Sequence, residues 1–135
     1  MSDLTGIHNI VTEFVAETTE KADELERELI DLEHDPSSRE LIAKVFRALH
    51  SIKGATSFLG FAKLCNLAHT GETLLARLRD GALTNTPEIT TALLSLVDAT
   101  REILAAIAST GKEGNRDYSD LTQTLAQLRD TRRIK

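Results

Sequence analysis

The segment Arg39–Gly60, with the sequence RELIAKVFRALHSIKGATSFLG, decides the fold of this chain. Its apolar residues and one threonine recur at the spacing of a helical face: Leu41, Ile42, Val45, Phe46, Leu49, Ile52 and Thr56. Such a spacing places one stripe of side chains on one side of a helix. Ser38 can cap the start of this helix, and Gly60 is suited to its end. The pattern therefore predicts an amphipathic helix that begins near Arg39 and ends near Gly60.

Four further segments have apolar stripes of the same period. They cover approximately residues 7–32, 61–80, 87–107 and 118–128. In the first of them the acidic residues from Glu13 to Glu28 fill the other positions, which is typical of a solvated face. Short loops between long amphipathic helices favour antiparallel neighbours. We therefore predict an all-α fold, an up-and-down antiparallel four-helix bundle with an additional C-terminal helix docked on it.

The composition favours one domain that binds neither nucleic acid nor a membrane surface. A chain of 135 residues is long enough for a single core, and we expect residues 1–130 to form it. Residues 131–135 are mostly basic and are expected to begin a linker or tail. The net charge is -5, with acidic and basic residues interspersed, which argues against binding to nucleic acid or to an anionic membrane surface.

The sequence favours a cytoplasmic location. No apolar run approaches the roughly 18 residues of a transmembrane helix, and the first residues lack the pattern of a signal peptide. Cys65 is the only cysteine, so the chain can form no internal disulfide and has no cysteine-based zinc site. These features are typical of a protein in a reducing compartment.

His50 is the first candidate for chemistry, because it lies off the apolar stripe of its helix. At 100° per residue the stripe centres at about 50° from Leu41, whereas His50 falls at about 180°. Lys53, Gly54 and Ser57 share this exposed surface. A glycine inside a helix costs roughly 1 kcal/mol relative to alanine, so Gly54 suggests the close approach of another protein.

A second polar stripe lies on the segment 61–80. Its members are mostly small: Ala62, Cys65, His69, Glu72 and Ala76. His69 and Glu72 are three residues apart and hence on one face, which in an antiparallel helix pair could adjoin the His50 face. One site would then contain His50, Lys53, His69 and Glu72. Each of these residues alone has an ordinary explanation, and we interpret His8 and His34 as structural or incidental.

The residues around His50 resemble a known motif. Ala48–Phe61 is similar to the histidine-x-apolar-lysine-glycine motif of histidine phosphotransfer (HPt) domains, and FRALHSIKGATSFLGF resembles the chemotaxis kinase family CheA in particular. His69 and Glu72 stand where that family has its second histidine and its glutamate, a pair that other HPt domains generally lack. Many CheA sequences have two glycines after the lysine, whereas Ala55 follows Gly54 here, so the shape around His50 can differ.

The resemblance implies a function in two-component chemotaxis signalling. His50 would accept a phosphoryl group from ATP through a separate histidine-kinase catalytic domain and donate it to an aspartate of a CheY- or CheB-like receiver domain. Glu72 would orient His50, while Lys53 and His69 would stabilise the charge of the phosphoryl group. The predicted partner surface contains Arg47, Gly54, Ser57, Ala62 and Cys65.

The same resemblance predicts that the chain is no enzyme by itself. It has no glycine-rich nucleotide loop, so it is expected to bind no cofactor and no metal, and ATP and Mg²⁺ would belong to the separate kinase domain. The isolated domain is expected to be monomeric. The second interpretation of the function is an HPt module of a non-chemotaxis phosphorelay or hybrid kinase.

Three other classes fit less well. A di-metal four-helix bundle uses two inward Glu-x-x-His pairs, whereas this chain has one reversed pair and its candidate residues are predicted to point outward. The dimerisation bundle of a sensor histidine kinase typically has an acidic residue after the histidine and a nearby proline, whereas Ser51 follows His50. A helical adaptor without chemistry would need no such group of four polar residues.

Overall fold

The computed structural model describes residues 2–131; within this range the side chains of residues 2–5, 7 and 8 are not described. It contains five helices: α1 (Ser2–His34), α2 (Arg39–Leu59), α3 (Ala62–Arg79), α4 (Pro87–Thr110) and α5 (Ser119–Arg129). The described residues form no β-strand. The predicted all-α class is confirmed, and α1 begins several residues earlier than the apolar pattern indicated.

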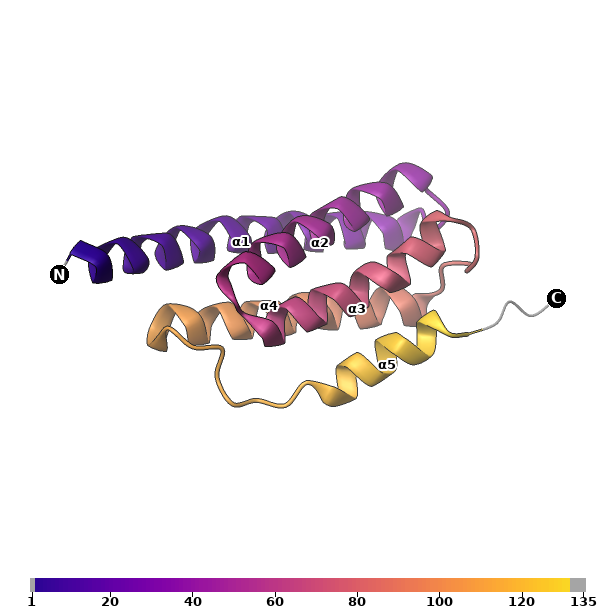
Figure 1. The fold of residues 1–135 in the computed structure, drawn as a ribbon. Helices are drawn as coiled ribbons and strands as arrows, with labels where there is room; N and C mark the ends of the chain where they lie inside the picture. The colour runs from indigo at the N-terminus through magenta and orange to yellow at the C-terminus, as the bar shows by residue number, and fades with distance from the viewer. Residues whose placement is uncertain (1, 132–135) are drawn as a thin grey trace.

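The first four helices run up and down in a bundle, and α5 lies along one side of it (Figure 1). Helix α1 packs against α2 and α4, while α3 packs against α2, α4 and α5. The predicted four-helix bundle with a docked fifth helix is therefore confirmed. None of the described helices combines the length and the apolar composition that a membrane span requires.

The interior of the bundle is filled mainly by leucine, isoleucine, valine and alanine side chains from all five helices. Helix α2 contributes the stripe that its sequence predicted, and its buried members are Ile42, Val45, Ala48, Leu49, Ile52 and Thr56. Thr56 donates a hydrogen bond from Oγ1 to the carbonyl oxygen of Lys53 at 2.9 Å, so this buried hydroxyl is satisfied within its own helix. Because the stripe faces inward, the His50 side of α2 faces outward.

The ends of α2 are fixed by the two residues that the sequence indicated. Ser38 accepts a hydrogen bond from the amide of Leu41 at 3.2 Å, which satisfies one of the free N–H groups of the first turn. Gly60 has a φ of 80°, in the left-handed region that glycine adopts without strain, and α3 begins at Ala62. The short connection makes α2 and α3 antiparallel neighbours, which brings their polar faces together.

Gly71 shows how closely α3 approaches the other helices. A Cβ atom at this position would lie 2.5 Å from Cδ2 of Leu96 and 3.0 Å from Cδ1 of Leu49. Both distances are too short for ordinary carbon contacts, so a larger residue here would force the side chains of Leu96 and Leu49 to move. The next residue, Glu72, lies on the same closely packed turn.

The loop between α4 and α5 is bonded to the start of α3. The carboxylate of Glu113 accepts hydrogen bonds from the amides of Lys63 at 3.2 Å and Leu64 at 2.7 Å. These amides belong to the first turn of α3 and have no partner within the helix. The predicted tail, residues 131–135, lies outside the described residues except for Thr131.

Candidate functional site

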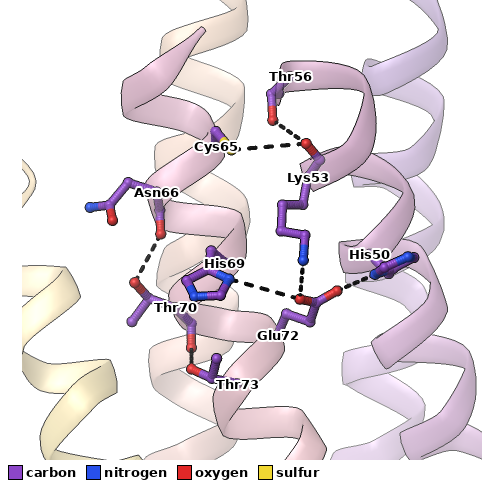
Figure 2. A network of polar contacts seen from close by, with 9 residues as sticks. All are labelled: His50, Lys53, Thr56, Cys65, Asn66, His69, Thr70, Glu72 and Thr73. Carbon is purple, nitrogen blue, oxygen red and sulfur yellow. Dashed lines mark hydrogen bonds and ion pairs between the residues drawn. The ribbon is translucent and has the colours of Figure 1, made fainter. Parts of the chain in front are cut away.

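The carboxylate of Glu72 joins α2 and α3 (Figure 2). Its Oε1 accepts a hydrogen bond from Nζ of Lys53 at 2.6 Å, and its Oε2 is hydrogen-bonded to Nδ1 of His50. His50 and Lys53 are one helical turn apart, so both reach the same carboxylate from α2. The predicted meeting of the two polar faces is confirmed.

His69 lies at the edge of this group. It is one turn before Glu72 on α3, and its Nδ1 is 3.9 Å from Oε1 of Glu72, a distance too long for a hydrogen bond. Its side chain is 58% exposed. The structure thus brings all four predicted residues together, with His69 at the rim and not hydrogen-bonded to Glu72. For comparison, the Nδ1 atom of His34 is 3.0 Å from the carbonyl oxygen of Ile30, far along the chain from this site, and the side chain of His8 lies outside the described residues.

One detail of the sequence interpretation is wrong. The candidate residues were predicted to point outward, and His50 does so with 64% of its side chain exposed, but Glu72 is buried with 9% exposed. Glu72 lies at the border of the α3 core stripe, where α2 packs against α3. The partly buried Lys53 covers it further, because its ammonium group is bonded to the carboxylate. The sequence did not predict the ion pair between Lys53 and Glu72.

The charge of Glu72 is maintained by its two partners. Burial by itself would raise the pKa of this carboxyl group, but the bonds from Lys53 and His50 outweigh burial and hold the pKa below its ordinary value. Glu72 is therefore ionised at neutral pH. It is a buried anion with a donor on each oxygen, which is the condition under which a charge is stable between helices.

This arrangement leaves one nitrogen of His50 for chemistry. Since a carboxylate only accepts hydrogen bonds, the bond to Glu72 requires the hydrogen to be on Nδ1 of His50. The lone pair of the neutral ring is then on Nε2, for which the described part of the chain supplies no bonding partner. An exposed imidazole with a fixed tautomer can act as a nucleophile.

Two residues near His50 were missed as parts of the site. The ring of Phe46 is stacked on the imidazole, with centroids 6.2 Å apart and an angle of 11° between the planes. The guanidinium carbon of Arg79 is 4.3 Å from the centroid of Phe46. The sequence analysis placed Phe46 in the apolar stripe. Its position four residues before His50, on the same side of the helix, could have indicated the contact.

The residues of the predicted partner surface are at least partly exposed. Arg47, Gly54, Ser57 and Ala62 are exposed and Cys65 is half-buried. A Cβ atom on Gly54 would meet no other atom within 4 Å, so the fold itself does not require a glycine at this position. Phe58, which the sequence interpretation did not include, is 87% exposed and lies one turn beyond Gly54. Whether these residues bind a partner stays a prediction.

Comparison with known proteins places the chain in a family. Residues 9–131 match the Hpt domain family. The sensor histidine kinase CheAY of Helicobacter pylori is 32% identical over 126 residues, which are 93% of this chain and 16% of that protein. The chain spans less than a fifth of the length of the curated relatives that it matches.

Solved structures are similar over most of their length. The CheA phosphotransferase domain from Thermotoga maritima has a TM-score of 0.72 and 32% sequence identity, with 74% of this chain and 95% of that chain covered. The phosphorylated P1 domain of CheA3, in complex with CheY6 from R. sphaeroides, has a TM-score of 0.78 and 24% identity, with 90% and 94% covered. The second likeness bears on the fold alone.

Proposed function

Because this chain belongs to the Hpt domain family, in its CheA branch, we propose that it is the phosphoryl carrier of a chemotaxis two-component system. His50 accepts a phosphoryl group from ATP through a separate histidine-kinase catalytic domain. It then donates the group to an aspartate of a response-regulator receiver domain. The observation that carries this proposal is the bond between Glu72 and Nδ1 of His50, which leaves Nε2 exposed as a nucleophile.

In the first step, the lone pair of Nε2 attacks the γ-phosphorus of ATP, and the bond between that phosphorus and the bridging oxygen breaks. ADP leaves with the electron pair, and the imidazole gains a positive charge. Glu72 accepts the hydrogen bond of Nδ1–H throughout and stabilises this charge. In the second step an aspartate oxygen attacks the phosphorus, the bond to Nε2 breaks, and the imidazole becomes neutral again.

Lys53 and His69 stabilise the phosphoryl oxygens in this proposal. Lys53 is bonded to Oε1 of Glu72 and is 27% exposed, and His69, which is 58% exposed, lies 3.9 Å from the same oxygen. Phosphoryl transfer depends chiefly on positioning and on stabilising charge, so cations at the edge of the site favour it.

The receiver domain docks on the surface around His50. Gly54 lets a partner approach the helix closely, since nothing within the fold requires a glycine there. Phe58 presents an exposed aromatic ring next to it, a side chain of the type that anchors protein interfaces. The R. sphaeroides P1 domain is in complex with CheY6, the kind of partner proposed for this chain.

The chain by itself is a substrate and donor rather than an enzyme in this proposal. ATP and Mg²⁺ bind to the separate kinase domain, and this chain binds no cofactor. Among the described residues no group of three or more histidine, cysteine, aspartate or glutamate side chains is arranged to hold a metal ion. The domain limits of residues 1–130, the monomeric state and the cytoplasmic location remain predictions.

The test is phosphorylation by a CheA-type catalytic core with ATP. We expect one acid-labile, alkali-stable phosphate per chain, absent from the variant His50→Gln. The matched control is His34→Gln, which removes another exposed histidine and is expected to keep full labelling. Labelling that survives in His50→Gln would refute the assignment. Transfer from the phosphorylated chain to a panel of chemotaxis and phosphorelay receiver domains distinguishes the two signalling systems.

A second experiment tests the partner surface. The variant Phe58→Ser should lower kcat/KM for transfer to the receiver domain about tenfold, because a central aromatic anchor contributes at least 1–2 kcal/mol to an interface. The stability of the domain should be unchanged, since Phe58 is 87% exposed. Ser109→Ala, at an exposed position near the end of α4, a helix that packs against α1, α3 and α5, serves as the control. Equal transfer rates for all three proteins would remove Phe58 from the interface.

A further inference from the structure

Besides its bond to Glu72, the imidazole of His50 has a second contact, with the ring of Phe46. We infer that Phe46, supported by Arg79, is a positioning residue that sets the plane of the His50 ring for phosphoryl transfer. This inference rests on the proposed function of His50. It assigns to two residues of α2 and α3 a role that is separate from the carboxylate of Glu72.

The bond to Glu72 fixes one atom of the ring but not its plane. The ring is also tethered to the backbone through Cβ, but combined changes of χ1 and χ2 can keep Nδ1 near Oε2 while the ring plane tilts, and such a tilt moves Nε2. His50 is 64% exposed, so close packing does not prevent this tilt. A defined direction for Nε2 therefore requires another contact on the ring.

Phe46 supplies that contact. It is four residues before His50 and hence on the same side of α2. The angle of 11° between the rings makes them almost parallel, and the centroid distance of 6.2 Å indicates an offset stack, which is a favoured arrangement of aromatic rings. Rotation of the imidazole away from this plane would lose the stack.

Phe46 is itself held in place from two sides. It is half-buried and packs against the core, and the guanidinium carbon of Arg79 is 4.3 Å from its ring centroid. Arg79 ends α3, where its Nε is 3.1 Å from Oδ1 of Asp80 and its carbonyl oxygen accepts a hydrogen bond from Arg39 at 2.9 Å. The cation–π contact thus ties the end of α3 to the ring that supports His50.

The expected consequence is kinetic. Phosphoryl transfer requires the nucleophile to lie in line with the bond that breaks, so freedom of the ring lowers the rate of the step rather than the binding of the kinase. Phe46→Leu keeps an apolar side chain against the core and removes the stack. We expect a kcat about fivefold lower with KM changed less than about twofold, and a smaller loss of about twofold in Arg79→Gln.

The experiment compares these variants in two reactions. One is phosphorylation by the CheA-type catalytic core with ATP, and the other uses phosphoramidate, a small donor that needs no docking surface. In the second reaction Nε2 attacks the phosphorus of phosphoramidate, whose nitrogen is already protonated; the P–N bond breaks, ammonia leaves with the electron pair, and the imidazole gains a positive charge. The rate with phosphoramidate should fall in Phe46→Leu as kcat does with the kinase, and Phe46→Tyr, which keeps a ring, should restore both. The side chain of His50 should also become more mobile in Phe46→Leu by NMR relaxation.

The control is Phe14→Leu. Phe14 is a buried aromatic residue of α1 that stacks on Phe61, with centroids 5.3 Å apart, so its loss removes a comparable stack away from His50. Equal slowing in Phe14→Leu and Phe46→Leu would overturn the inference, because the loss would then come from stability. Unchanged rates, or a change in KM alone, would overturn it as well. Failure of the wild type to be labelled at His50 would instead refute the proposed function.

Discussion

Helix α2 has a glutamate against it from each neighbouring helix, and only one of the two has its hydrogen bonds complete. Glu72 of α3 is bonded through both oxygens, to Lys53 and to His50. Glu28 of α1 lies in a cleft with Lys44 and Arg47 of α2, yet its Oε1 is buried with no hydrogen-bond partner among the described residues. The two carboxylates thus share residue type and a place between helices, but Glu28 is only half-buried whereas Glu72 is buried, and they differ in bonding.

The difference appears in their titration. Burial raises the pKa of Glu28, with a smaller contribution from Glu24, and the charges of Lys44 and Arg47 only partly offset this. Burial also acts to raise the pKa of Glu72, but there the bonds from Lys53 and His50 outweigh it and leave the pKa lowered. Nearby cations alone therefore do not lower the pKa of a carboxyl group between helices. The carboxylate is stable as an anion when hydrogen-bond donors lie within bonding distance of its oxygens. Of these two carboxylates only Glu72 is also bonded to His50, the residue proposed to carry the phosphoryl group.

The largest expected difference between the two glutamates is in the rate of phosphorylation. Glu72→Gln keeps the size of the side chain but removes the anion that orients Nδ1–H and stabilises the positive imidazole. We expect phosphorylation by the CheA-type core to be about 100-fold slower, which is typical for the loss of a residue that assists a catalytic histidine. Initial rates of phosphate incorporation measure it.

The matched control for this rate is Glu28→Gln. It makes the same chemical change at the other carboxylate, which has no bond to His50, and is expected to leave the rate unchanged within about twofold. A similar slowing in both variants would contradict the assignment of Glu72, because the effect would then follow from the loss of a charge next to α2.

The sequence was sufficient to predict the fold because helical periodicity is a strong signal. Each apolar stripe identified a helix, and the ends of α2 at Ser38 and Gly60 were visible as capping residues. The length of the connection between α2 and α3 made them antiparallel neighbours, so the meeting of the His50 and Glu72 faces could also be predicted. These features depend on local chemistry that one segment of sequence contains.

The sequence was not sufficient to predict which polar groups are bonded. Glu28 was assigned to the solvated face of α1, and Glu72 to an outward stripe, because angular position on one helix does not report how deeply a neighbouring helix covers a residue. The bond of Lys53 to Glu72 depends on the distance between α2 and α3, and the stack of Phe46 on His50 depends on the rotamers of both rings. These properties arise from packing between elements.

The next difference is in stability at pH 7, where the same two substitutions should change the free energy of unfolding in opposite directions. Glu72→Gln leaves the ammonium group of Lys53 without its anion and should lower the free energy of unfolding by about 2 kcal/mol. Glu28→Gln removes the negative charge of a carboxylate whose Oε1 is buried without a hydrogen-bond partner. It should raise the free energy of unfolding by about 0.5 kcal/mol. Urea denaturation followed by circular dichroism measures both values.

Glu33→Gln is the reference for this comparison, because Glu33 is an exposed residue near the end of α1. It should change the free energy of unfolding by no more than about 0.5 kcal/mol. A loss of stability in Glu28→Gln comparable to that in Glu72→Gln would contradict the contrast, since it would mean that the charge of Glu28 is as well accommodated as that of Glu72.

The smallest expected difference is the order in which these two effects vanish as the pH falls. The pKa of Glu28 is raised by folding, so its destabilising effect is present at neutral pH, decreases as the pH falls through the folded value, and is gone below the ordinary value of 4.5. The pKa of Glu72 is lowered by folding, so its stabilising effect persists down to the ordinary value of 4.5 and is lost only as the pH falls further through the folded value. The free energy of unfolding is therefore to be measured as a function of pH. As the pH falls, Glu28→Gln should become equal to the wild type first, and Glu72→Gln should do so only at lower pH. The reverse order would mean that Glu28 rather than Glu72 has the completed set of bonds.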